Sequence, residues 1–155
     1  MALIYIKAPT ETPLFSDEKH QFLSRAWQEW FGVIGDRLAA GSLIDRGDPT
    51  AVDYTLTSFT ADGTWRDLNL SSIVPAGAKA IWLAVRIKDA VVGTLAKFRK
   101  NGLTNAINIT QMATQVASQD LYDDPVVVCD SARVIEYNIA AAMDEIDLTV
   151  KGWFI

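Results

Sequence analysis

The sequence has few of the residues that build disulfide frameworks and zinc sites. Its 155 residues include one cysteine, Cys129, and one histidine, His20. A single thiol cannot close an intrachain disulfide, and one cysteine with one histidine falls short of the four ligands that a structural zinc ion takes. We therefore expect a protein without a transition metal or another cofactor.

Excess basic charge and long apolar runs are also missing. The chain carries 14 Lys and Arg against 19 Asp and Glu, a net charge of −5, whereas a nucleic-acid-binding domain presents a basic surface. Its apolar runs are far shorter than the roughly 20 residues that span a bilayer, and its N-terminus lacks the pattern of a signal peptide. We expect a soluble protein made in the cytoplasm, with no nucleic-acid partner and no membrane insertion.

What the chain does contain is enough apolar residues for a folded core. Half of its residues are hydrophobic and 10% are aromatic, which disfavours disorder. At roughly 100–200 residues per domain, this length suits one domain with a short appendage. The change of pattern near residue 50 predicts an N-terminal arm and helix over 1–49 and a β domain over 50–155.

The first part of the chain predicts an extended arm followed by one helix. Pro9 and Pro13 restrict the backbone of residues 1–15 to extended geometry, so this arm is expected to serve as a tether or docking strand. Ser16 or Asp17 suits the N-cap of a helix over about 17–40.

Large apolar residues recur at helical spacing along this predicted helix. They form an amphipathic stripe that must pack either on the β domain or on copies of itself, and its near-heptad spacing favours self-association. The predicted oligomer or anchor interface comprises Phe22, Leu23, Trp27, Trp30, Phe31 and Ile34.

The remainder of the chain has the period-2 alternation of β-strands. The clearest case is Ile81, Leu83, Val85 and Ile87, whose odd positions are expected to face a core. Asn101-Gly102 predicts a type I′ hairpin turn between strands over 94–100 and 105–111. With further strands near 52–56, 65–70, 125–129, 133–139 and 146–154, the pattern predicts a mainly β fold, an antiparallel sandwich or jelly roll of about 7–8 strands.

Residues for catalysis are scarce. His20 is expected in solvent in the first turn of the helix, and Cys129 follows an apolar run where a cysteine usually behaves as a small hydrophobe. We therefore expect no enzymatic activity. Clustered acids could be solvated loop residues or hold calcium through their oxygens, and both readings stay open for Asp120, Asp123, Asp124, Asp130, Asp144, Glu145 and Asp147.

Two features could contact a ligand. The basic segment 97–100, with Arg99 and Lys100, could meet an acidic partner or a glycan carboxylate, or it could protect a hairpin from edge pairing. Trp82, with Trp65 and Trp153, could form a stacking platform for sugars, although tryptophans in strands also serve as core or interface.

Several stretches resemble those of bacteriophage structural proteins. The proline-containing segment 8–16 followed by Trp-Gln-Glu-Trp-Phe at 27–31 resembles the N-terminal region of small phage virion proteins. The segments 65–80 and 97–102 resemble β-sandwich domains on phage fibres, tails and capsid appendages.

The resemblance implies a non-enzymatic virion protein. Residues 1–40 would anchor it to other virion proteins and to sister subunits, commonly as a trimer, with the β-sandwich pointing outward. The position on the particle, whether head, neck or tail, stays open. The alternative is a glycan- or receptor-binding module that uses exposed aromatics on a host surface.

Overall fold

The computed structural model describes residues 24–39 and 42–155, and the side chains of 24–32 and 42–155. The chain divides into two compact units, Met1–Ser42 and Leu43–Ile155. The predicted arm, the helix start at Ser16 or Asp17, and His20 lie outside the described residues.

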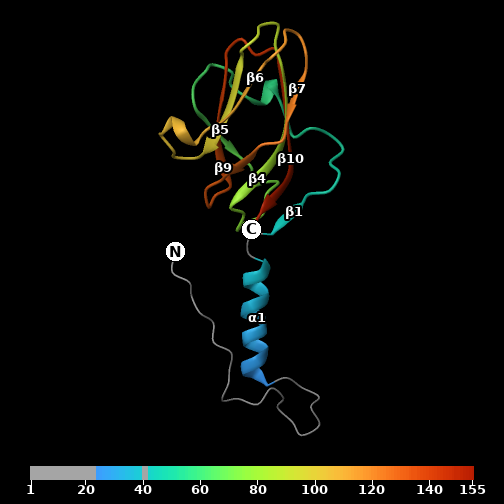
Figure 1. Cartoon of the computed structure of the whole chain (residues 1–155), viewed down its shortest axis with the longest axis vertical. Coiled ribbons are helices and arrows are strands. Elements are labelled where there is room, and N and C mark those ends of the chain that lie inside the picture. The colour runs from blue at the N-terminus through green and yellow to red at the C-terminus, as the bar shows by residue number, and fades with distance from the viewer. Residues whose placement is uncertain (1–23, 40–41) are drawn as a thin grey trace. The chain divides into compact units, whose positions relative to one another are not determined.

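The first unit contains one helix, α1 (Arg25–Ala39). The carbonyl of Ser24 accepts hydrogen bonds from the N–H groups of Trp27 and Gln28, both at 3.0 Å. The helix continues through Gly32 and Gly35, although glycine is a poor helix former. The predicted helix is therefore present over this range (Figure 1).

The second unit is a sandwich of two antiparallel sheets (Figure 1). This confirms the predicted mainly β fold. In the six-stranded sheet, β10 (Glu145–Phe154) lies between β1 (Leu43–Asp45) and β4 (Ala80–Lys88), with β2 (Tyr54–Thr55) also on β10 and with β7 (Leu121–Asp123) and β8 (Val126–Val128) on β4. The four-stranded sheet has the order β3 (Arg66–Asn69), β9 (Val134–Ile139), β5 (Leu95–Lys100) and β6 (Thr110–Ala113). Two short 3-10 helices, η1 (Leu56–Ser58) and η2 (Ala106–Asn108), interrupt the connections.

The core lies between the two sheets and confirms the alternation predicted for residues 81–87. Every odd residue of β4 from Ile81 to Ile87 is at most 1% exposed. The four-stranded sheet contributes fully buried side chains of its own, and each such large apolar group stabilises the fold by roughly 1.5–3 kcal/mol. They include Phe98, Ile135 and Ile139.

A bulge in β10 shifts the alternation of that strand. Val150 pairs with Leu83 and Gly152 pairs with Trp82, so Lys151 is the extra residue. Before the bulge, Ile146, Leu148 and Val150 are buried, whereas after it Trp153 packs against the core. The inward positions of β10 therefore change from even to odd.

The turn at Asn101-Gly102 differs from the prediction. β5 pairs with β6 as expected, but the register Phe98↔Thr110 leaves a connection over 101–109 that contains η2. Gly102 has a φ of +80°, while Asn101 does not have a positive φ, and the Leu103 N–H donates to the Lys100 carbonyl at 3.3 Å. This geometry is that of a type II turn, so the predicted type I′ turn is wrong. Asn101 instead donates through Nδ2 to Asp130 Oδ2 at 2.9 Å.

The β unit begins at Leu43, within the residues 1–49 that were expected to form the N-terminal arm and helix. Ile44 in β1 pairs with Trp153, and Arg46 bonds to Asp53 at 2.5 Å and to the Val150 carbonyl at 3.1 Å. β1 approaches β10 closely at Gly152, where a Cβ would lie 2.3 Å from the Ile44 carbonyl oxygen. Pairing with the long strand β10 therefore places Asp45 in the sheet and holds Arg46 against it.

Candidate functional site

The helix α1 carries a cluster of three aromatic side chains. The ring centroids of Trp27 and Trp30 lie 5.4 Å apart, those of Trp30 and Phe31 5.1 Å, and those of Trp27 and Phe31 5.9 Å. Two of the three contacts are edge-to-face, which aromatic quadrupoles favour. Phe31 is 47% exposed, while both tryptophans are partly buried.

Three of the six predicted interface residues are therefore brought together on one face of α1. Phe22 and Leu23 lie outside the described residues. Ile34 belongs to the part of α1 for which only the backbone is described.

The three predicted ligand-contact residues do not form one site. Trp82 lies on β4 in the six-stranded sheet, whereas Arg99 and Lys100 lie on β5 in the four-stranded sheet. Trp82 alternates with the buried Ile81 and Leu83 and therefore points to the outer face of its sheet. The Lys151 ammonium lies 4.0 Å from the Trp82 ring centroid.

Arg99 is held by groups of its own unit. Its guanidinium bonds to Glu136 and lies 3.9 Å from the Trp65 ring centroid. Its side chain is only 10% exposed. Arg99 and its neighbour Lys100 both border a surface groove, and of the two only Arg99 is held by Glu136 and Trp65.

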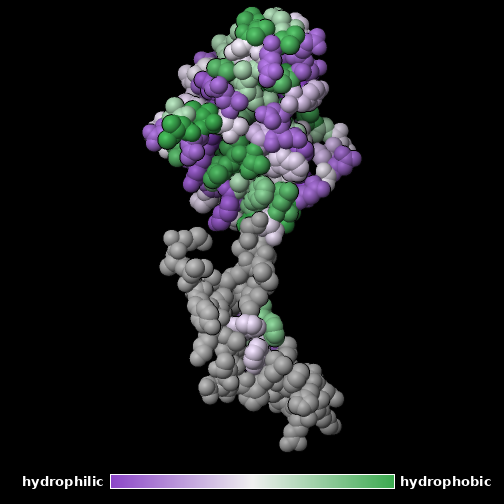
Figure 2. Space-filling view, viewed as in Figure 1, coloured by the Kyte–Doolittle hydropathy of each residue, from purple (hydrophilic) through white to green (hydrophobic). Residues whose placement is uncertain are grey.

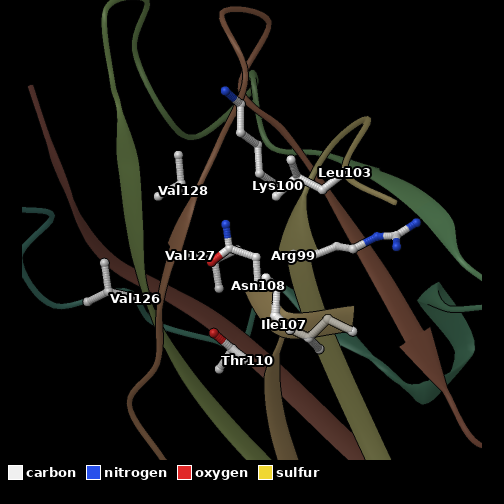
Figure 3. Close-up of a pocket in the computed structure, with 10 residues that line it drawn as sticks. Arg99, Lys100, Leu103, Ile107, Asn108, Thr110, Val126, Val127 and Val128 are labelled. Atoms are coloured by element: carbon white, nitrogen blue, oxygen red, sulfur yellow. The ribbon is translucent and has the colours of Figure 1, made fainter. Parts of the chain in front are cut away.

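That groove, of about 380 Å³, lies between β8 and the connection that follows β5 (Figure 3). Figure 3 shows the valines of β8 on one side and Ile107, Asn108 and Leu103 beside them. Ile107 is 93% exposed, and Val126 and Val128 are 48% and 51% exposed, while Val127 between them is buried. Residues Val126–Val128 were expected to be a strand, but sequence alone gave no signal that two of the valines face solvent.

A second hollow, of about 300 Å³, lies on the outer face of the six-stranded sheet. Tyr122, which pairs with Arg86, is 70% exposed at this hollow. The rest of the lining mixes apolar, cationic and acidic residues and comprises Val52, Ala84, Val85, Arg86, Asp123, Asp124, Asp147 and Thr149. Asp123 was expected to be a loop residue or a calcium ligand, whereas it belongs to β7, so the place of Tyr122 on a sheet face was missed.

Most of the clustered acids bind cationic side chains. Arg86 bonds to Asp147 at 2.6 Å, to Glu145 at 2.9 Å and to Asp120 at 3.0 Å. The hydrogen bond to Asp147 is the main reason that the pKa of Arg86 is raised. Bonding to Lys88 lowers the pKa of Glu145. These acids therefore neutralise strand cations, and no group of three His, Cys, Asp or Glu within the described residues is placed to hold a metal ion.

Asp130 organises the chain at the end of β8. Its carboxylate accepts the N–H groups of Ala132 at 2.8 Å and Val134 at 2.9 Å, besides the Asn101 amide. These bonds lower the pKa of Asp130, and the bond from the Val134 N–H has the largest effect. The neighbouring Cys129 is buried, and burial raises the pKa of its thiol, which disfavours the reactive thiolate.

Comparison with known proteins adds no relative to this picture. No family matches the chain, and no curated protein matches it either. Within the described residues, no helix is long and apolar enough to cross a membrane.

Proposed function

We propose that this chain is a non-enzymatic bacteriophage virion structural protein, a homo-oligomeric appendage anchored by its N-terminal region. The observation that carries the proposal is the aromatic cluster of Trp27, Trp30 and Phe31 on α1. The resemblance of segments 8–16, 27–31, 65–80 and 97–102 to phage proteins supports the virion assignment.

A helix of this kind requires packing. Fifteen residues are at the margin of what forms a stable helix alone in water, and most helical stability in proteins comes from packing an apolar face. Covering a large aromatic side chain is worth about 2 kcal/mol or more. A copy of the same helix supplies a matching aromatic face, and three copies around one axis would bury these faces together.

The β unit supports the outward role because it completes its own core. Buried side chains from both sheets fill its interior, and ion pairs tie neighbouring strands on its surface. Its surface mixes hydrophilic and hydrophobic residues (Figure 2). A unit of this kind can project from a particle while the N-terminal residues contact other virion proteins.

The oligomer is tested by light scattering on the wild type and on the Trp27→Ala/Phe31→Ala double variant. We expect a homo-oligomer, with a trimer as the specific prediction, and at least a tenfold weakening of association in the variant because buried aromatic area is lost. The matched control is Arg25→Ala/Glu29→Ala, which removes an exposed ion pair from the same helix and should leave association unchanged. A monomeric wild type contradicts the proposal.

The virion assignment has its own test. The chain should co-purify with intact phage particles through a density gradient and be found there by mass spectrometry at a fixed copy number. Recovery only in the particle-free fractions contradicts it.

The hollow beside Tyr122 supports a second function, binding of a host-surface glycan. An exposed aromatic ring can stack on the apolar face of a pyranose, and Asp123 and Asp124 could accept hydrogen bonds from its hydroxyls. On a glycan array, the wild type and Tyr122→Phe should bind and Tyr122→Ala should lose roughly tenfold or more in affinity. Silence of the wild type, or equal binding by the alanine variant, contradicts this function.

A further inference from the structure

The edge strand formed by β7 and β8 has two different halves. Both pair with β4, and Asp124-Pro125 separates them. Natural proteins protect exposed edges with charges and prolines. Asp123 and Asp124 provide charge in the first half, and the Asp124 N–H is satisfied by Asp123 Oδ1 at 2.8 Å. Val126–Val128 has no charged residue.

The first and last valines of β8 direct their backbone N–H and C=O groups away from β4. The Leu83 N–H donates to the Pro125 carbonyl at 2.9 Å, which makes this a hydrogen-bonded position of the β4–β8 ladder. Since such positions alternate in antiparallel pairs, Val127 bonds to β4, whereas the N–H and C=O groups of Val126 and Val128 point away from it. Within the described part of the chain, these four groups have no backbone or side-chain partner.

The groove of about 380 Å³ lies along this unprotected half. β6 pairs with β5 only as far as Phe98, and the connection over 101–109 borders the groove together with β8. Ile107 and Leu103 give the groove apolar walls, as Figure 3 shows. Unpaired strand groups next to apolar walls are the features that bind an added β-strand: main-chain bonds supply affinity and alternate side chains fill pockets.

We infer that this groove takes the N-terminal segment 2–6 of a neighbouring copy as an additional strand beside β8. The segment reads Ala-Leu-Ile-Tyr-Ile, rich in β-branched and aromatic residues that suit strands. Pro9 follows shortly after and would end the ladder, since proline cannot donate a hydrogen bond. This inference rests on the proposed homo-oligomer, because the neighbour is a second copy of this chain.

The exchange would use the length of chain between the segment and α1. About 17 residues separate the segment from Ser24, and at roughly 3.3 Å per extended residue they reach about 55 Å. With such an arm, each copy could both give and receive a strand.

Disulfide trapping on the full-length chain tests this exchange. In a Cys129→Ala background, one protein carries a single cysteine at position 3, 4, 5 or 6 and the other carries Val128→Cys. The two are mixed and oxidised with copper–phenanthroline. We expect a disulfide between the two chains in roughly tenfold higher yield than with Val91→Cys, a matched control because Val91 is also exposed, at 60%.

The outcomes separate the possibilities. Yields no higher than the Val91→Cys control at all four positions overturn the inference. So does a disulfide that forms only when both cysteines are on one chain, because the segment would then dock on its own copy. If light scattering shows a stable oligomer while no selective disulfide forms, the exchange alone fails. A monomeric wild type removes the proposed function itself.

Discussion

The helix and the β unit use their apolar residues in different ways. In the β unit, large side chains such as Phe98, Leu83 and Ile135 are fully buried within the unit itself. On α1, Phe31 remains 47% exposed beside two partly buried tryptophans. The comparison teaches that the β unit covers these large apolar side chains by itself, whereas the described part of α1 leaves an aromatic ring open to the packing that we propose.

The largest effect should come from the core of the β unit. Phe98→Ala should lower the free energy of unfolding by about 3–5 kcal/mol, because a fully buried ring is replaced by a cavity. Urea denaturation followed by tryptophan fluorescence measures this loss. Phe31→Ala is the comparison variant, and an equal loss there would remove the distinction between the two regions.

A smaller loss is expected where β1 meets β10. Gly152→Ala places a Cβ against the Ile44 carbonyl, so β1 must shift and about 2 kcal/mol of stability should be lost. Thermal unfolding provides the readout, and hydrogen exchange should show faster exchange at residues 43–46. Gly32→Ala is the control and should not destabilise, because the added carbon meets nothing within 4 Å outside the neighbouring backbone of its own helix. An unchanged Gly152→Ala protein would contradict the close approach.

The smallest effect concerns Asp130 and pH. Its pKa is lowered in the folded state, so its contribution is present above the unfolded pKa near 4 and is lost as the pH falls through the lower folded value. Asp130→Asn should cost about 1 kcal/mol at pH 7 and should flatten the loss of stability below about pH 4. Urea titrations between pH 7 and pH 3 test this, and parallel curves for both proteins would contradict it.

Local sequence pattern predicted the parts of the fold that depend on local burial. The alternation of Ile81 to Ile87 is such a case, because a strand between two layers must place every second residue inward. The aromatic cluster on α1 likewise follows from the spacing of Trp27, Trp30 and Phe31.

The remaining features depend on residues far apart in the chain. The Asn101-Gly102 turn differs because Asn101 bonds to Asp130, and β1 forms because Gly152 admits it. Trp82 and Arg99 could not be assigned to different sheets until the strand order was known. The valines of β8 and Tyr122 are exposed because no distant described segment packs over them, and a local sequence pattern carries no information about that.

The bulge at Lys151 has a consequence for Trp82. As the extra residue of the bulge, Lys151 has no paired residue on β4. Its ammonium lies over the Trp82 ring and forms an ion pair with the carboxylate of Asp124 at 2.8 Å. A single inserted residue thus links β10 to Trp82 on β4 and to Asp124 between β7 and β8. The Lys151 side chain also covers one face of the indole. Tyr122, at 70% exposed, therefore offers a more open aromatic surface than Trp82.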